Sequence, residues 1–219
     1  MWAYESVFYQ IYPLGFVGAP FENDGVETHR ILKVLDWTDH IKKLGANAIY
    51  FSPVFESDTH GYNTRDYRKI DCRLGSNEDF KQVCDKLHSE GIRVVLDGVF
   101  NHVSRNHPAV QAALDETAGR LNPADNPWHG LVRAHVGDNG EPALDVFEGH
   151  GDLVALDHSA DETVDYVVHV MSHWLDRGAA GWRLDAAYAV PSPFWARVLP
   201  QVKAAHPYSC LLYTSDAAD

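Results

Sequence analysis

The chain has 219 residues, and its 31 acidic side chains outnumber its 18 basic ones to give a formal net charge of −13. This negative excess repels phosphate backbones and anionic lipids, so we expect no nucleic-acid partner and no membrane partner. A hydrophobic fraction of 45% and an aromatic fraction of 11% are typical of a chain that buries a core, which argues against disorder.

Strands and helices are predicted in alternation from the start of the chain. Residues 7–12 are a β-branched and aromatic run that favours a buried strand. Residues 31–44 carry apolar side chains at helical spacing, and Gly45 follows where a glycine commonly ends a helix. Residues 48–51 form the next apolar run, which predicts a second strand.

A helix and a third strand follow. Ser76 and Asp79 have the capping-box spacing that begins a helix, although Glu or Gln is commoner than Asp at the second position. Gly91 is placed to end this helix, and residues 92–99 form an apolar run that predicts a buried strand. The segment after it is rich in Pro, Gly, Asn, Asp and His. It is too long for an ordinary loop, so we interpret it as an insertion after the third strand.

The last predicted elements restore the alternation. A helix is expected from residue 161 to Gly178, a fourth strand over residues 182–187 and a fourth helix over residues 194–205. Strands and helices joined by right-handed crossovers predict an α/β fold, in which helices cover a parallel sheet. The pattern alone leaves open whether this sheet is doubly wound or belongs to a barrel.

Polar side chains gather where the predicted strands end. Asp97 and His102 lie at the end of the third strand, and Arg183 and Asp185 belong to the fourth. The two charged residues of the fourth strand alternate with Leu184, so they point to the same face. Buried charges are rare unless paired, and α/β proteins place their chemistry at the carboxyl ends of strands. We therefore predict a polar site there.

Simpler interpretations exist for each of these residues. An aspartate at a strand end is more often a helix cap or a loop contact than a catalyst, and Arg183 with Asp185 could form a structural ion pair. His169 and His173 have the spacing of a zinc pair on a helix, but no acidic residue follows His169 as a metalloprotease requires. We expect these histidines to lie on a partly exposed helix face. The occurrence of polar residues on successive strand ends favours a site.

Several of these segments match motifs of one known family. Residues 8–13 look like its first barrel strand, and residues 44–53 match the approach to its second. Residues 97–102 are similar to the pattern Asp-x-Val-x-Asn-His, and residues 181–186 contain Gly-x-Arg-x-Asp. The chain therefore resembles the alpha-amylase family, glycoside hydrolase family thirteen, from residue 8 to about residue 207.

The resemblance implies that the α/β fold is the N-terminal half, about four β/α units, of a (β/α)₈ TIM barrel. Residues 1–102 would be the first part of the catalytic barrel, and residues 103–158 a short domain B inserted after strand three. Residues 159–209 would continue the barrel through strand four and helix four. Residues 210–219 continue neither pattern and look like a translated sequencing adapter, so we expect a non-native tail there.

The resemblance also implies roles for individual residues. Asp185 matches the nucleophile that forms a covalent glycosyl intermediate, and Arg183 would hold that carboxylate ionised. Asp97 would brace Arg183 and the floor of the site. His102 would hydrogen-bond the sugar next to the cleaved bond, and Tyr62 would stack on it.

The resemblance also points to a residue that could bind a metal ion. Asn101 matches a residue that binds calcium in many members of the family, whereas many intracellular members lack that site. We expect no required cofactor, with calcium as a possible ligand. Residues 153–157 lie where a further family motif belongs, but they lack its Pro and Asn, which leaves the substrate preference open.

The activity implied by the resemblance is that of a retaining glycoside hydrolase, with α-1,4-linked maltooligosaccharides or related α-glucans as substrate partners. The family's general acid is a Glu after strand five, but no Glu follows Asp185, so we expect this chain to be inactive as it stands. We find no signal peptide and an odd number of cysteines, which favours a cytoplasmic maltodextrin- or cyclodextrin-degrading enzyme. A transglycosylase or sugar isomerase of the family, or a non-catalytic carbohydrate-binding relative, is the alternative. The sequence leaves the oligomeric state open.

Overall fold

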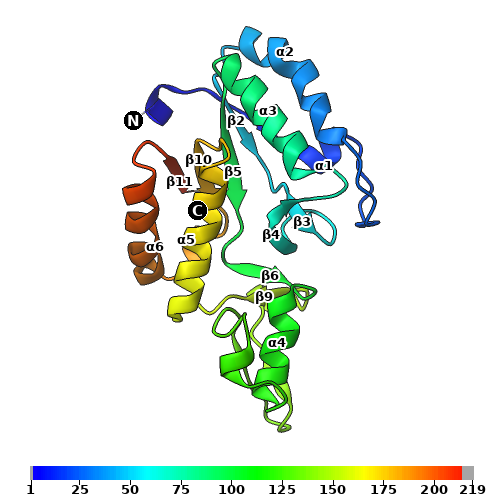
Figure 1. Ribbon diagram of the computed structural model, residues 1–219, viewed down its shortest axis with the longest axis vertical. Helices are drawn as coiled ribbons and strands as arrows, with labels where there is room; N and C mark the ends of the chain where they lie inside the picture. The colour runs from blue at the N-terminus through cyan, green and yellow to red at the C-terminus, as the bar shows by residue number, and fades with distance from the viewer. Residues whose placement is uncertain (1, 214–219) are drawn as a thin grey trace.

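A parallel sheet of five strands lies at the centre of the computed structural model, which describes residues 2–213 (Figure 1). In sheet order the strands are β1 (Phe8–Ile11), β2 (Ala48–Phe51), β5 (Arg93–Gly98), β10 (Gly181–Leu184) and β11 (Cys210–Tyr213). They lie side by side in the order in which they occur along the chain. A doubly wound sheet has a reversal of strand order, so the observed order favours the arrangement of consecutive barrel strands.

The four predicted strands are confirmed, and their register explains which side chains meet. The fourth strand begins one residue earlier than predicted and ends at Leu184. β5 and β10 pair so that Asp97 lies opposite Arg183 and Gly98 lies opposite Leu184. The two charged groups of neighbouring strands are therefore held at the same level, near the carboxyl ends of both strands.

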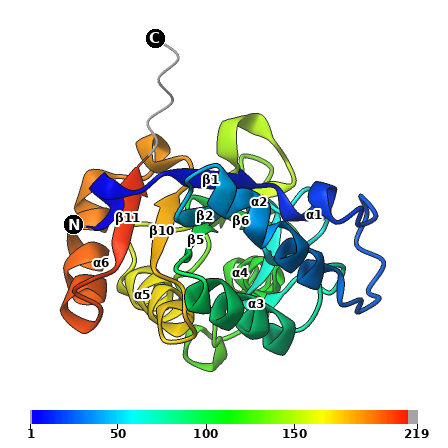
Figure 2. The same cartoon turned by 90° about the horizontal axis from the view of Figure 1, so that it is seen from above.

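Three long helices follow one another along one face of the sheet (Figure 2). They are α3 (Asn77–Ser89), α5 (Asp161–Leu175) and α6 (Ser192–Ala205). The predicted capping box is confirmed at the start of α3. There the Asp79 N–H donates to Ser76 Oγ at 3.1 Å and the Ser76 N–H donates to Asp79 Oδ2 at 2.7 Å. Because each of these two backbone N–H groups is bound by the other residue's side chain, the pair fixes where the helix begins.

The core lies between the sheet and these helices. Trp174 of α5 and Trp182 of β10 are buried, and Phe55 contacts both of them with ring centroids 5.3 and 6.0 Å apart. The Trp174 indole donates to the Tyr67 carbonyl at 2.7 Å, which satisfies its N–H inside the core. Within the described residues, no helix has the length and apolar character needed to span a bilayer.

The single helix predicted over residues 31–44 is wrong in detail. A 3₁₀ helix, η2 (Arg30–Trp37), comes first, and a shorter α-helix, α2 (Thr38–Lys43), follows it. The Thr38 hydroxyl donates to the Leu35 carbonyl at 2.8 Å, and such contacts compete with regular helical hydrogen bonding. Gly45 follows α2 as predicted, with a φ of +79° that favours glycine.

The prediction that residues 210–219 continue neither pattern is wrong for residues 210–213. These residues form β11, which pairs in parallel with β10 from Gly181 opposite Cys210 to Leu184 opposite Tyr213. Without it, the edge of β10 would leave backbone N–H and C=O groups unpaired, and the run Cys-Leu-Leu-Tyr is apolar enough for a buried strand. The rest of the segment, 214–219, lies outside the described residues.

Between β5 and α5 the chain forms a separate lobe beyond the carboxyl end of β5, which we call the insertion lobe (residues 103–158; Figure 1). Two antiparallel strand pairs and one helix build it, namely β6 (His102–Ser104) with β9 (Leu153–Ala155), β7 (Ala134–Val136) with β8 (Pro142–Leu144), and α4 (Pro108–Thr117). An unpredicted hairpin of β3 (Phe55–Ser57) and β4 (Thr64–Ile70) lies between β2 and α3 in the sequence. The short helical segments are η1 (Trp2–Glu5), α1 (Pro13–Phe16), η3 (Pro123–Asp125), η4 (Phe147–Gly149) and η5 (Ala187–Ala189).

Candidate active site

Three charged side chains meet at the carboxyl ends of β5 and β10. One nitrogen of the Arg183 guanidinium donates to both oxygens of Asp97, at 3.0 and 3.2 Å, and to Oδ1 of Asp185 at 2.5 Å. The Asp97 side chain is fully buried, whereas the side chains of Arg183 and Asp185 keep exposed fractions of 19% and 16%. The structure therefore brings these three predicted site residues together, and Asp185 is the carboxylate that stays accessible.

The backbone turns sharply after Asp185. Its N–H donates to the Gly98 carbonyl at 3.0 Å, which extends the pairing of β5 and β10 by one residue. Ala186 then adopts a φ of +44°, in the left-handed region that residues with a Cβ seldom occupy. Strained backbone of this kind is concentrated at functional sites, and here it redirects the chain directly after the candidate nucleophile.

Tyr50 of β2 completes the cluster and was not predicted. Its hydroxyl donates to Asp97 Oδ2 at 2.6 Å. Burial raises the pKa of Asp97 to about 6, although Arg183 and Tyr50 both favour its charged form. Burial is the largest single effect on Arg183 and would lower its pKa, but the charges of Asp97, Tyr50 and Asp185 and the hydrogen bonding to Asp97 together outweigh it and raise that pKa. A tyrosine in an otherwise apolar strand was the available signal, because its hydroxyl needs a partner when the ring is buried.

His102 is held by two hydrogen bonds within the protein. Its Nε2 contacts the Tyr62 carbonyl at 3.2 Å and its Nδ1 contacts Asn101 Nδ2 at 3.1 Å. A carbonyl only accepts and an amide nitrogen only donates, so the imidazole is neutral with its proton on Nε2. Burial lowers the pKa of His102, in agreement with a neutral ring. A hydrogen bond from His102 to a sugar would have to replace one of these two contacts.

Tyr62 lies near both carboxylates of the cluster. Burial first, and then the charges of Asp97 and Asp185, raise the pKa of Tyr62 to about 12. The insertion lobe also reaches this place, because Phe147 of η4 stacks on His102 with ring centroids 4.9 Å apart and planes 22° apart. No local sequence pattern indicates the contact of Phe147, since it depends on how the insertion lobe returns to the sheet.

The residue connected with calcium by the family resemblance, Asn101, uses its amide to hold His102. Calcium takes roughly six to eight oxygen ligands. Among the described residues, the one group of three His, Cys, Asp or Glu side chains that could share an ion lies elsewhere, at Glu56, Asp71 and Cys72. Calcium at Asn101 therefore stays a prediction, and no step proposed below uses one.

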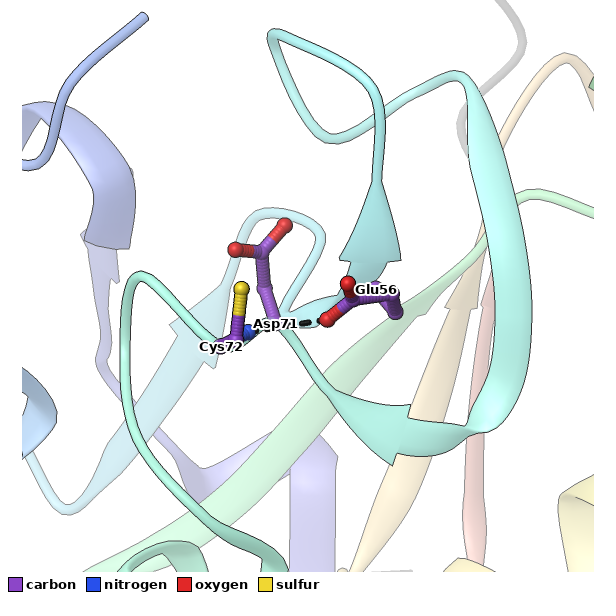
Figure 3. Close-up of side chains that lie close together, drawn as sticks. All are labelled: Glu56, Asp71 and Cys72. Carbon is purple, nitrogen blue, oxygen red and sulfur yellow. Dashed lines mark hydrogen bonds between the residues drawn. The ribbon is translucent and has the colours of Figure 1, made fainter. Parts of the chain in front are cut away.

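The group of Glu56, Asp71 and Cys72 lies around the β3–β4 hairpin, with potential ligand atoms within 4.8 Å of one another (Figure 3). The Cys72 backbone N–H donates to Glu56 Oε2 at 2.9 Å. Arg73 forms two hydrogen bonds with Asp71, at 2.7 and 2.8 Å, and Arg65 pairs with Glu56 at 3.1 Å. Arginines therefore already balance both carboxylates. Burial raises the pKa of the Cys72 thiol, which disfavours the thiolate that metals bind, so we assign this group a structural role.

His169 and His173 occupy α5 without meeting a shared partner. His169 is exposed, and its Nδ1 contacts the carbonyl of Asp165 on its own helix at 2.7 Å. His173 packs edge-on against Trp174, with ring centroids 5.1 Å apart. In the part of the chain that the structure describes, neither histidine belongs to a group of three potential metal ligands.

Comparison with known proteins agrees with this geometry. The model of the family described as alpha amylase, catalytic domain, matches residues 10–207, which is nearly the whole chain. The chain belongs to the alpha-amylase family. A cyclomaltodextrinase from Bacillus sp is 32% identical to it over 228 residues, covering 96% of this chain and 40% of that relative. An oligo-1,6-glucosidase from Heyndrickxia coagulans is 29% identical over 203 residues, covering 84% of this chain and 35% of that relative.

Solved structures of the alpha-amylase family share this α/β fold. The ligand-free form of a cyclic α-maltosyl-(1→6)-maltose hydrolase from Arthrobacter globiformis superposes with a TM-score of 0.79 at 29% identity, covering 97% of this chain and 51% of that one. The relatives named here are glycoside hydrolases. The chain spans two-fifths or less of the length of the two sequence relatives and about half of the solved structure.

Proposed function

We propose that this chain supplies the nucleophile side of a retaining glycoside hydrolase that cleaves α-1,4-glucosidic bonds in maltooligosaccharides or related α-glucans. The observation that carries the proposal is the position of Arg183 between a fully buried carboxylate, Asp97, and a solvent-accessible one, Asp185. A guanidinium in this place balances the charge of Asp185 and fixes its orientation. The names of two relatives, a cyclomaltodextrinase and a maltogenic alpha-amylase from Bacillus acidopullulyticus, support the substrate class.

In the proposed mechanism, an oxygen of Asp185 bonds to the anomeric carbon of the sugar as the bond to the leaving oxygen breaks. The leaving oxygen takes a proton from a general acid. Water later bonds to the anomeric carbon as its bond to Asp185 breaks, and the water gives a proton to the deprotonated acid, which returns Asp185 to a carboxylate. Tyr62 offers a ring face near the two carboxylates on which a sugar stacks. His102 positions Tyr62, since its Nε2 proton is bound to the Tyr62 carbonyl.

The general acid is the missing part. Retaining enzymes place a second carboxyl group about 5–5.5 Å from the nucleophile. No Glu follows Asp185 in this sequence. Asp97 is unsuited to the task, because it is fully buried and bound by Arg183 and Tyr50. We therefore propose that the chain as it stands does not hydrolyse unactivated glucans.

The proposal extends to the architecture and the compartment. Residues 1–102 and 159–209 would form consecutive strands and helices of a half-barrel, and the insertion lobe would be domain B. The strand order β1-β2-β5-β10-β11 and the place of the lobe between β5 and α5 support this division. The three cysteines, all within the described residues, are unpaired, which supports a cytoplasmic location.

A covalent label tests the nucleophile without needing the missing acid. A ring-fluorinated α-glucosyl fluoride carries a leaving group that departs without protonation, and its ring fluorine slows the release of the sugar. We expect intact-mass and peptide-mass spectra of the 219-residue chain to show one added glycosyl group, on Asp185. The variant Asp185→Asn should gain none, and the matched control Asp176→Asn, at an exposed carboxylate of the α5 C-cap, should label like the parent.

Absence of label on Asp185 in the folded parent chain would refute the nucleophile assignment and would favour a non-catalytic carbohydrate-binding relative. Release of glucose from maltotriose by the parent chain, lost in Asp185→Asn, would refute the proposed inactivity. Adding maltose to the labelled chain distinguishes the two enzymatic alternatives. Faster loss of the label with a longer saccharide as product indicates a transglycosylase, and loss to free sugar indicates a hydrolase.

A further inference from the structure

A pocket of about 510 Å³ lies between the insertion lobe, β4 and the first turns of α5, and it shares no lining residue with the Asp97, Arg183 and Asp185 cluster. Its volume falls in the range of roughly 300–1,000 Å³ that small-molecule sites have. Its lining includes Asp66 and Arg68 of β4, Trp128 of the lobe, and Glu162, Tyr166 and His169 of α5.

Regular secondary structure supplies two walls of this pocket. Glu162, Tyr166 and His169 stand at positions i, i+4 and i+7 of α5, so they line one face of the helix. Asp66 and Arg68 of β4 line the second wall, at a place where the register with β3 shifts and the Arg68 N–H donates to Asp66 Oδ1 at 2.8 Å. The helix wall is therefore held by backbone hydrogen bonding, and the β4 wall is held by this side-chain contact.

The third wall, the loop that carries Trp128, is fixed by side-chain hydrogen bonds. Glu116 of α4 accepts from Asn126 Nδ2 at 2.8 Å and contacts His129 Nδ1 at 2.9 Å, so it holds the residues on both sides of Trp128. The Asn126 side chain also accepts from the Trp128 N–H at 2.8 Å. A ring held in this way loses little conformational entropy when it binds a ligand.

Two aromatic rings form an apolar corner inside this frame. The ring centroids of Trp128 and Tyr166 lie 6.0 Å apart, with planes at 74°. Around them, within the described residues, no hydrogen-bond partner engages the Trp128 indole N–H, the Tyr166 hydroxyl or the Arg68 guanidinium. Glu162 and Asp66 add carboxylate acceptors. The pocket thus places aromatic ring faces beside both hydrogen-bond donors and hydrogen-bond acceptors.

We propose that this pocket is a second saccharide-binding site, which holds a sugar unit of an α-glucan chain outside the active site. A sugar ring has an apolar C–H face and a rim of hydroxyl groups that both donate and accept, which matches the two rings and the mixed polar groups. Two carboxylates against one guanidinium disfavour anionic ligands such as phosphates. The choice of an α-glucan over other saccharides rests on the proposed function.

The experiment uses the 219-residue chain labelled with 5-fluorotryptophan and observes ¹⁹F NMR spectra during a titration with maltotriose. The chain has six tryptophans, and Trp128→Phe assigns the Trp128 signal by its disappearance. We expect the Trp128 signal to shift with saturation. Tyr166→Ala should weaken this binding by about tenfold or more, as expected when an aromatic anchor is removed. Trp37→Phe, at a tryptophan 40% exposed on η2, is the matched control and should leave the binding curve unchanged.

Several outcomes overturn the proposal. A Trp128 signal that stays in place while Asp185 still takes the covalent label removes the second site and leaves the proposed function intact. A shift with cellotriose of equal size removes the assignment to α-glucans. Unchanged affinity in Tyr166→Ala, with a melting curve like that of the parent, removes the pocket as the place of binding. Failure of Asp185 to take the label, together with a saturable shift of the Trp128 signal, refutes the active-site assignment and supports the second site.

Discussion

Two pairs of Asp and Arg in this chain have the same spacing in the sequence but opposite surroundings. Asp71 and Arg73 are separated by one residue, and so are Arg183 and Asp185. The first pair is closed, because Arg73 and Asp71 have side-chain exposed fractions of 0% and 1%. Arg73 donates to Asp71 at 2.7 and 2.8 Å, to Ser57 Oγ at 2.9 Å, and to two backbone carbonyls. The second pair is open, since both of its side chains retain contact with solvent.

The difference shows that spacing alone does not separate a structural ion pair from a chemical one. In the closed pair every guanidinium nitrogen of Arg73 has a partner within the protein, so the pair joins the β3–β4 hairpin to the segment before η2. In the open pair the arginine serves two carboxylates of unequal burial, and the more accessible one, Asp185, lies at the end of a strand beside the left-handed Ala186. An ion pair whose hydrogen bonds are all satisfied within the protein indicates a structural role. An ion pair with an accessible carboxylate at a strand end indicates a catalytic role.

The largest effect is expected when one carboxylate of each pair is neutralised, which tests the division into a closed and an open pair. Asp71→Asn leaves the buried charge of Arg73 without its hydrogen-bonded counter-charge, so we expect a loss of about 3–5 kcal/mol in the free energy of unfolding. Asp185→Asn leaves the charge of Arg183 paired with Asp97, so the loss in the free energy of unfolding should stay below about 1 kcal/mol. Urea unfolding of both variants, followed by circular dichroism, measures the two values. Equal losses, or a larger one for Asp185→Asn, would contradict the division into a closed and an open pair.

Local sequence patterns predicted most of the sheet, because strands buried on both faces are continuous apolar runs. The same patterns found Asp97 and the open pair, since alternation within a strand and the edge of a sheet are local properties. The contacts that were missed join distant segments. Tyr50 meets Asp97 47 residues away, and Phe147 reaches His102 from the insertion lobe. The topology of the chain determines these contacts, and no local pattern encodes them.

The strand β11 and the closed pair were missed for related reasons. A short run such as Cys-Leu-Leu-Tyr becomes a strand only where a free edge accepts it, and the edge of β10 is known only once the sheet is built. Asp71 and Arg73 stand in a segment with no regular pattern, and their partners are a hydroxyl and carbonyls from elsewhere in the chain. Sequence reasoning is weakest where backbone carbonyls satisfy a charge.

His107 extends the comparison to a titratable group that is buried without a counter-charge. Burial lowers the pKa of His107 from 6.5 to about 4, and the charge of Asp66 opposes this without cancelling it. The unfolded chain therefore binds a proton more readily, and stability present above pH 6.5 is lost as the pH falls toward 4. The contribution of His107 to the free energy of unfolding falls by about 3 kcal/mol over that pH range.

The test for His107 is the variant His107→Asn. Asparagine keeps a side-chain acceptor for the Ala109 N–H at the start of α4 but does not titrate in this range. We expect the free energy of unfolding of the parent to fall more steeply than that of the variant between pH 6.5 and pH 4.5, in parallel urea titrations. His102 and His158 are also buried and remain in both proteins, so they contribute equally. Parallel curves for the two proteins would show that His107 does not carry this acid sensitivity.

The smallest effect is expected at Tyr50, which contacts the closed carboxylate of the active-site cluster but not the accessible one. Tyr50→Phe keeps the ring and removes the 2.6 Å hydrogen bond to Asp97. We expect a loss of about 1–2 kcal/mol in the free energy of unfolding, since the bond is made to a charged group. Covalent labelling of Asp185 should slow only about threefold, because Arg183 still binds Asp97 through both of its oxygens. Asp97→Asn removes the charge that Arg183 pairs with, so it should slow labelling more. Equal slowing in the two variants would mean that Tyr50, and not the charge of Asp97, sets the position of Arg183 beside the nucleophile.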